Sequence, residues 1–532
     1  MNKRNYLVYM KNILLPCLLF CMITGVFTGA LVFGFKWLAS LVMTYAHHLY
    51  EFISAHPIYI LPGVVVLAVL ALAAFGIARI CPNTKGGGIP TAIAILRGVI
   101  TFRWVRNLLG TFTASLITFF VGVPLGNEGP CVLLGTGGGK GAVSVMGKKS
   151  KAWERYIMTG GASAGFAVAT GAPISGIFFA LEEAHQRFSP MIVMAACSSV
   201  MFGVGTEAWL VSVTGKSFTL FDVSVSPLAM RDAWIALLVG VCVGLFAVLF
   251  SHVQRWIFGI FKTKLKQINS IVKIFTIYLL VFLVGVFTSF TYIGTGHELL
   301  LAILENRMVW YVLLLLLVLR MCLSLVANAA NITGGLFIPM IALGGIVSSL
   351  LANGFIQLGL MDASLYVSVV VLGISACLAS MVKVPITAIV FTFEVLTGTT
   401  NMLHTLVAVT FAYLVTEMFR VPSMNEMVIE ARVDEINEGK EIVVVDTFVE
   451  VKPGSFVIGK QVRDIFWPHN LFVLSVKHSE SRAMQDSEGG KSIQEGDTLH
   501  LRFQTCDFES TKAELLALVG EQDILEERAG MV

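Results

Sequence analysis

The sequence predicts an all-α polytopic membrane protein, built as an inverted repeat of broken helices and followed by a small α/β domain. Three observations predict this fold class: apolar runs of membrane-spanning length, an internal repeat, and a change of composition near residue 431. A buried-core helical enzyme is the alternative, but a soluble core does not need so much apolar sequence.

Apolar residues dominate the first 430 positions. The chain has 532 residues, of which 56% are hydrophobic, and its mean hydropathy is +0.81. A helix needs about 20 apolar residues to cross a bilayer. The clearest apolar runs are Leu14–Phe35, Ile58–Ala78, Asn107–Val123, Trp234–Phe250, Ile274–Phe290, Trp310–Leu325 and Leu403–Leu414.

The first apolar run is too long for the core of a cleavable signal, which spans about 7–15 residues. The segment before it, MNKRNYLVYMK, is basic. Because positively charged flanks stay on the cytoplasmic side, we expect the N-terminus to be cytoplasmic.

Two segments of the apolar region repeat each other. Residues 161–182 read GASAGFAVATGAPISGIFFALE and residues 373–394 read GISACLASMVKVPITAIVFTFE, with nine of 22 positions identical. A second pair, GNEGP (126–130) and GLFIP (335–339), recurs at nearly the same offset. Chance similarity between small-residue-rich helices is the alternative. In transporters, such duplicated halves pack as inverted repeats around a central site.

Glycine and proline interrupt the apolar sequence at GGGIP (Gly86–Pro90), GNEGP (Gly126–Pro130) and GGLFIP (Gly334–Pro339). Broken helices of this kind mark the binding site of a transporter. Glycine lets backbone N–H groups approach a ligand, and the start of a helix attracts an anion. Glu128 places a carboxylate at such a point, and intramembrane carboxylates mark ion or proton pathways. The pattern predicts an anion carrier or channel with a titratable plug.

Two patterns typical of enzymes occur without the context that they need. Ser163 lies in a GxSxG match, but inside an apolar helix without the strand–turn–helix geometry. The glycine run from Gly135 to Gly141, with Lys140, fails the phosphate-loop pattern at two positions. Histidines and cysteines show no ligand spacing, and no basic patch accompanies a nucleic-acid motif. We therefore expect no enzyme activity, cofactor, metal or nucleic-acid partner.

The last hundred residues differ from the rest of the chain. Residues 431–532 hold 11 basic and 19 acidic residues, against 26 and 15 in residues 1–430. Short β-type runs, glycine turns and a closing helix at Ser510–Val519 predict a small α/β module. The predicted domains are therefore 1–430 in the membrane and 440–520 in water.

With these motifs in view, residues 10–430 resemble the CLC family of chloride channels and proton-coupled anion exchangers. GGGIP corresponds to that family's GSGIP motif, GNEGP to its GREGP motif, and GGLFIP to its GxFxP motif. The segment from residue 161 to residue 183 also looks like the family's fifth-to-sixth-segment signature. The resemblance implies a homodimer embedded in membrane lipid, with one pore in each subunit.

The resemblance also assigns roles to residues. It implies that backbone N–H groups bind the anion at three levels. These are Gly86 and Gly87 near the cytoplasm, Leu336 and Phe337 at the centre, and Gly129 and Ile338 nearer the outside.

The two proton-handling residues implied by the resemblance are both glutamates. Glu128 matches the external gating glutamate, and Glu183 matches the internal proton-transfer glutamate of the exchanger branch. A buried carboxyl group suits a proton relay. The alternative is that Glu182 and Glu183 form an acidic pair at a helix end that faces water.

Three departures from the family pattern affect the anion path. Gly87 replaces the central serine, Met424 aligns with the central tyrosine, and Asn127 replaces the GREGP arginine. Asn127 and Met424 are the candidate pore-lining side chains. The central anion would then be held almost wholly by backbone N–H groups, which predicts weak binding and shallow selectivity. The departures at the serine and arginine positions, Gly87 and Asn127, suggest the family's fluoride-exporting branch as an alternative.

The tail from residue 453 to residue 503 looks like the TrkA C-terminal (RCK-C) regulatory module, which implies an unidentified small ligand or dimerisation. We therefore expect a homodimeric, multi-pass plasma-membrane protein with a cytoplasmic tail. Its expected function is proton-coupled exchange of chloride-like anions. A passive anion channel and a proton-coupled fluoride exporter are the alternatives.

Overall fold

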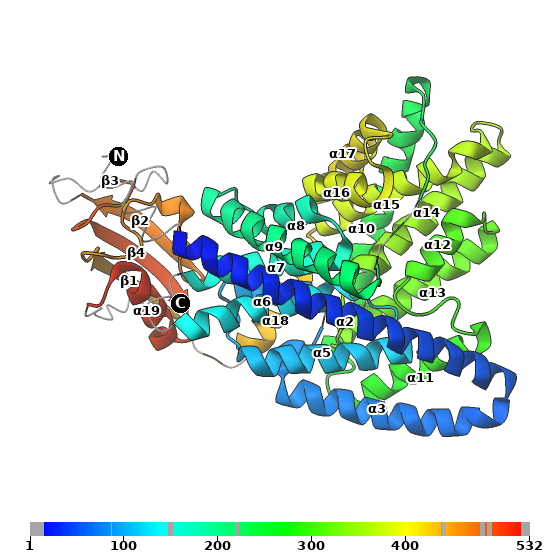
Figure 1. The fold of residues 1–532 in the computed structure, drawn as a ribbon, viewed down its shortest axis with the longest axis horizontal. Coiled ribbons are helices and arrows are strands. Elements are labelled where there is room, and N and C mark those ends of the chain that lie inside the picture. Colours follow the sequence, from blue (N-terminus) through cyan, green and yellow to red (C-terminus); the bar gives the residue numbers. More distant parts are fainter. Residues whose placement is uncertain are drawn as a thin grey trace.

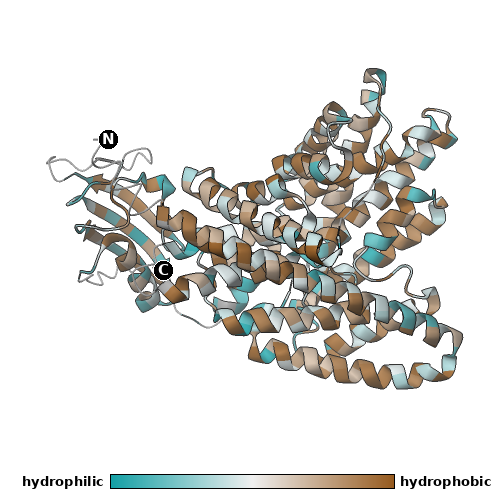
Figure 2. Ribbon diagram, viewed as in Figure 1, coloured by the Kyte–Doolittle hydropathy of each residue, from teal (hydrophilic) through white to brown (hydrophobic). Residues whose placement is uncertain are grey.

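A computed structural model describes residues 15–86, 88–146, 153–218, 221, 223–437, 440, 442–478, 485–486 and 492–522. The basic N-terminal segment and Gly87 lie outside the described residues. Helices form most of the molecule, and one small sheet lies at one end of it (Figure 1). Apolar residues dominate the helices, whereas the sheet end carries more hydrophilic residues (Figure 2). The predicted fold class is confirmed.

Within the described residues, nine helices are long and apolar enough to cross a membrane. The chain is therefore a multi-pass membrane protein. The helices of the first half are α2 (Leu15–Ala55), α3 (Ile60–Ile80), α4 (Ile89–Leu96), α5 (Trp104–Val121), α6 (Glu128–Met146), α7 (Glu154–Thr170), α8 (Pro173–Phe178), the π-helical segment η5 (Phe179–Ala184) and α9 (Pro190–Thr214).

The second half begins with a long helix and ends with one that crosses the predicted boundary at residue 430. Its helices are α10 (Ala233–Thr263), α11 (Ser270–Thr288), α12 (His297–Glu305), α13 (Trp310–Ala329), α14 (Phe337–Gln357), α15 (Tyr366–Val382), α16 (Pro385–Thr392), the π-helical segment η8 (Phe393–Thr397), α17 (Met402–Met418) and α18 (Met424–Asn437).

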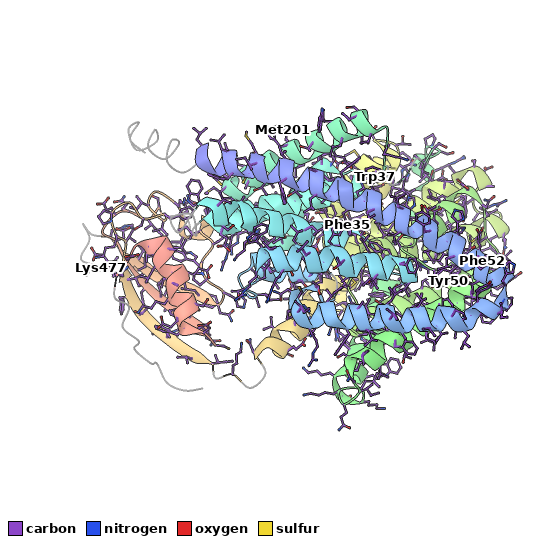
Figure 3. All side chains as sticks on the ribbon, turned by 60° about the horizontal axis from the view of Figure 1, so that its bottom comes forward. Phe35, Trp37, Tyr50, Phe52, Met201 and Lys477 are labelled. Atoms are coloured by element: carbon purple, nitrogen blue, oxygen red, sulfur yellow. The ribbon has the colours of Figure 1, made fainter. Side chains whose placement is uncertain are left out.

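Helix α2 runs along most of the membrane part and has one buried side and one exposed side. Phe35 is fully buried, whereas Trp37 is 41% exposed, as expected for a helix that faces lipid on one side (Figure 3). Near the end of α2, the Tyr50 hydroxyl donates a 2.7 Å hydrogen bond to the carbonyl of Val121. This bond ties α2 to the end of α5, seven residues before Glu128.

The internal repeat extends to whole helices. Helices α7 and α15 begin at residues 154 and 366 and end at residues 170 and 382, so both ends are displaced by 212 residues. A short helix starting with proline follows each of them, at Pro173 and Pro385, and a π-helical segment follows that helix. The duplication expected from the sequence is therefore present in the fold.

A glutamate from each half accepts hydrogen bonds from a helix start in the other half. Glu182, in η5 of the first half, accepts hydrogen bonds of 2.9 and 2.7 Å from the N–H groups of Ile386 and Thr387 at the start of α16. Glu394, in η8 of the second half, accepts bonds of 2.7 and 2.8 Å from the N–H groups at the start of α8. Each glutamate thus caps a helix of the other half, where the first N–H groups have no partner within the helix.

Removing one of these caps is expected to destabilise the membrane part. Glu394→Ala leaves two helix-start N–H groups and the Ser175 hydroxyl without their acceptor. A hydrogen bond to a charged group contributes about 1.5–3 kcal/mol, so the free energy of unfolding falls by about 2 kcal/mol or more. Thermal unfolding of the purified protein in detergent measures the change.

The matched control for this experiment is Glu417→Ala. Glu417 is 51% exposed and pairs with Lys383 on the surface, where an ion pair contributes about 0–1 kcal/mol. Equal unfolding midpoints for the Glu394 and Glu417 variants would contradict the capping role.

The glycine run in α6 serves helix packing. A Cβ atom on Gly135 would lie 2.1 Å from the carbonyl oxygen of Gly161, so only glycine permits this crossing of α6 and α7. The Lys140 side chain pairs with Glu154 instead of facing a phosphate loop. Ser163 is fully buried within α7, in the helical setting that the sequence predicted.

The tail forms an antiparallel sheet in the order β1-β4-β2-β3, followed by one helix. Alternate side chains of the central strands point into a core that α19 also contributes to. Residues 456–458, which have β-type sequence, form turns instead. The elements are β1 (Val443–Glu450), β2 (Leu471–Lys477), β3 (Gln485–Asp486), β4 (Thr498–Thr505) and α19 (Phe508–Val519).

The tail contacts the membrane part through an aromatic cluster. The Phe466 ring lies 4.4 Å from the rings of both Tyr156 and His185, and the Tyr156 hydroxyl donates a 2.6 Å hydrogen bond to the carbonyl of Asp464. The tail core and the ends of α2, α7 and α9 belong to one hydrophobic cluster. His185, one of the residues in this contact, is only two residues after Glu183.

Candidate functional site

Three interrupted segments of the apolar sequence meet inside the membrane part. Gly126 and Gly335 exchange backbone hydrogen bonds of 2.6 and 2.8 Å, in an isolated antiparallel bridge. The carbonyl of Gly86 accepts a 3.4 Å bond from the N–H of Gly334, and the Gly86 N–H donates to the carbonyl of Asn331 at 3.2 Å. The loops before α4, α6 and α14 are therefore joined by their backbones.

Because the loops are joined, three helices begin at one place. A Cβ atom on Gly88 would lie 2.3 Å from the backbone of Gly129, so the start of α4 touches the start of α6. A Cβ atom on Gly335, just before α14, would lie 2.8 Å from the N–H nitrogen of Gly129. The starts of α4, α6 and α14 each present N–H groups that have no partner within their own helix, and a positive dipole end, and together they favour a negative charge.

The Glu128 carboxylate occupies this meeting point. Its side chain is fully buried, and neither oxygen has a hydrogen-bond partner among the described residues. One oxygen lies directly against Gly126, because a Cβ atom there would be 2.4 Å away. The backbone N–H groups of Glu128 itself and of Ile338 face the carboxylate, without meeting the geometry of a hydrogen bond. A buried carboxylate without partners is costly unless it is protonated or can move away when an anion arrives.

A small cavity lies on the other side of the start of α14. Its volume is about 10 Å³, which is room for about one water-sized particle. Leu336 and Phe337 contribute to its wall, whereas the next residue, Ile338, faces Glu128. The cavity is lined by Ile89, Pro90, Asn328, Leu336, Phe337, Met340, Met424 and Asn425.

Helix α18 closes this cavity, and contacts with other helices fix its position. Met424, its first residue, is buried and lines the cavity. Gln254 of α10 donates a hydrogen bond to the Met424 carbonyl at 3.5 Å. Arg432 donates to the carbonyls of Lys85 and Pro82 at 2.9 and 3.0 Å, and so anchors α18 to the loop before α4.

Glu183 lies behind the cavity wall. It is 6% exposed, and the side-chain amide of Asn425 donates a hydrogen bond to its carboxylate. Arg97 donates to the Glu183 carbonyl at 3.1 Å and pairs with Glu426 at 2.7 Å. Because Asn425 also lines the cavity, one side chain links Glu183 to it. Glu182 points to α16 instead, so the two glutamates do not form a water-facing pair.

The remaining predicted positions differ in what they offer to an anion. The Gly86 N–H is already bonded to Asn331, so it is engaged within the protein. Asn127 is half-buried and is not among the residues that line the cavity; its carbonyl accepts the N–H of Cys131 at 3.0 Å. Gly87 lies outside the described residues.

Sequence reasoning missed two amide side chains at the cavity, Asn328 and Asn425. Neither belongs to a motif, and Asn425 and Glu183 are 242 residues apart. The only available signal was a polar residue within or next to an apolar segment. That signal is present for Asn328, which lies near the end of the apolar α13.

Comparison with known proteins points to one family. The family model described as "Voltage gated chloride channel" matches residues 69–417. A slow cyanobacterial Cl⁻/H⁺ antiporter superposes with a TM-score of 0.73 at 22% identity, covering 79% of this chain and 99% of its own. A eukaryotic CLC transporter gives 0.64 at 18% identity, covering 79% and 74%. A CLC-type fluoride/proton antiporter gives 0.62 at 21% identity, covering 76% and 96%.

Proposed function

The chain belongs to the voltage-gated chloride channel family, and from this premise we propose that it exchanges chloride-like anions for protons across a membrane. The observation that carries the proposal is the fully buried Glu128 carboxylate, without a hydrogen-bond partner among the described residues, where three helices begin. An anion is attracted to the same helix starts as the carboxylate. The anion and the ionised carboxylate therefore compete, and protonation of Glu128 favours the anion.

Exchange is favoured over passive conduction by the position of Glu183. A proton that crosses the membrane needs further groups that accept it beyond Glu128, and a second buried carboxylate can be such a group. Glu183 is buried, and Asn425 connects it to the cavity. A passive anion channel has no need for a buried carboxylate in this position.

A proton-coupled fluoride exporter is the second candidate. The likeness to a fluoride/proton antiporter supports it, as does Asn127 in place of the motif arginine. The cavity has room for about one small particle, which suits fluoride as well as a partly enclosed chloride.

We further propose a homodimer in the plasma membrane, with the N-terminus and the tail in the cytoplasm. The basic N-terminal sequence supports this orientation. The start of α2 shares a hydrophobic cluster with the tail core, so both lie on one side. The tail resembles TrkA C-terminal modules and contacts His185, two residues after Glu183, which supports a regulatory role with an unidentified small ligand.

Proton uptake driven by an anion gradient tests the proposed function. Purified protein in liposomes is given opposing gradients of chloride, fluoride, nitrate or bicarbonate, and external pH is followed. We expect chloride to drive protons in the opposite direction, and protein-free liposomes to show no such movement. Anion flux without proton movement would indicate a channel, and proton movement with fluoride alone would indicate the fluoride exporter.

A further inference from the structure

One face of α13 carries three buried polar side chains. Arg320, Ser324 and Asn328 follow one another at intervals of four residues, so they lie on the same side of the helix. Their exposed fractions are 1%, 1% and 3%. Polar groups at this depth normally have hydrogen-bond partners.

The first two residues of this face hold loops in place. Arg320 donates to the carbonyls of Tyr292 and Gly294 at 3.1 and 2.9 Å, in the loop before α12. Ser324 donates to the carbonyl of Pro124 at 2.9 Å, four residues before Glu128. These two side chains have a positioning role.

Asn328 has no such partner. Neither its Oδ1 nor its Nδ2 has a hydrogen-bond partner among the described residues. Its side chain instead lines the small cavity between the starts of α4, α14 and α18. A buried amide of this kind needs an explanation, and a ligand in the cavity supplies one.

Asn107 on α5 shows that a buried amide without a hydrogen-bond partner does not by itself indicate a ligand site. It is also 3% exposed, and both its side-chain atoms also lack partners among the described residues. However, Asn107 is not among the residues that line the cavity. Asn328 combines the missing partner with a place in the cavity wall.

We infer that the Nδ2 group of Asn328 donates a hydrogen bond to the anion in this cavity and sets the selectivity of the site. The inference rests on the proposed anion transport. Met424, Leu336 and Phe337, which also line the cavity, have apolar side chains, and the Asn425 amide already donates to Glu183. Asn328 therefore offers a side-chain donor that has no other partner among the described residues. A fixed amide donor favours a small, charge-dense anion over a larger one with spread charge, such as nitrate.

Calorimetric titration of the purified protein with chloride tests this role, using Asn328→Leu as the main variant. Leucine has a similar size and no donor. We expect chloride affinity to fall about 10- to 150-fold, the effect of one lost hydrogen bond to a charged group. We also expect the preference for chloride over nitrate to shrink. Asn107→Leu is the matched control, and its chloride affinity should stay at the original value.

A second pair of variants keeps the test valid if Asn328→Leu does not fold. Asn328→Thr and Asn328→Val have nearly the same shape, but only threonine has a hydroxyl donor. The Asn328→Thr protein should bind chloride more tightly than the Asn328→Val protein. Equal affinities of the two, or an unchanged affinity in Asn328→Leu, would overturn the role of Asn328.

Flux measurements on the same preparations separate this inference from the proposed function. If the unmodified protein neither binds nor transports any of the four anions, both ideas fail. If it binds and transports chloride while Asn328→Leu binds equally well, only the assignment of Asn328 fails.

Discussion

Proton movement coupled to anion flux is expected to disappear in Glu128→Ala, while anion flux continues. The structure places the fully buried Glu128 carboxylate, which can take up and release a proton, at the meeting point of α4, α6 and α14. Without this carboxylate, the proton loses its carrier at the helix starts and the anion loses its competitor. Liposome assays that record proton and anion flux together measure both changes.

Glu128→Gln distinguishes charge from size in the same assay. Glutamine keeps the shape of the side chain but cannot bind or release a proton, so it should also abolish coupling. Glu298→Gln is the control, because Glu298 is an acidic residue whose side chain is 89% exposed. Proton uptake that survives in Glu128→Ala would contradict the assignment of Glu128 as the gate.

The fold could be predicted because its defining features are local in the sequence. Apolar runs mark the spans, and glycine and proline mark the broken helices at Gly86, Gly126 and Gly334. The repeat fixed the correspondence of α7 with α15, and the structure extends it to both helix ends. These signals depend on backbone geometry, which short motifs describe well.

Contacts between distant segments could not be predicted. The reciprocal caps of Glu182 and Glu394 join residues more than 200 positions apart, and no sequence pattern distinguishes the role of Glu182 from that of Glu183. The engaged N–H group of Gly86 depends on the position of Asn331 in another helix connection. Such pairings follow from tertiary packing.

The tail illustrates a further limit of composition. The change of charge near residue 431 predicts a separate domain, and the residues after it form a four-stranded sheet and α19. However, the charge balance of the tail does not predict how the tail packs against the membrane helices. Phe466 and Tyr156 bring the tail core and the membrane helices into one hydrophobic cluster, and α18 extends to residue 437.

Substitution of Glu183 is also expected to have a large effect on proton movement. Glu183→Gln should abolish proton movement while anion binding and anion flux remain. The glutamine Oε1 can still accept the hydrogen bond from Asn425, so the cavity wall keeps its shape. Only the ability to take up a proton is lost. Because Glu128 stays intact, the anion flux of this variant should still depend on pH, whereas that of Glu128→Ala should not.

This contrast separates the two carboxylates by function. Glu430→Gln on α18 is the matched control, because Glu430 is exposed and its change should leave coupling intact. Calorimetry should give the same chloride affinity for Glu183→Gln as for the unmodified protein, which excludes damage to the cavity. If coupled proton movement persisted in Glu183→Gln, the proton would need another route from the cavity, and Asn425 would serve only to hold α18 against η5. A loss of both fluxes would instead identify Glu183 as part of the cavity framework.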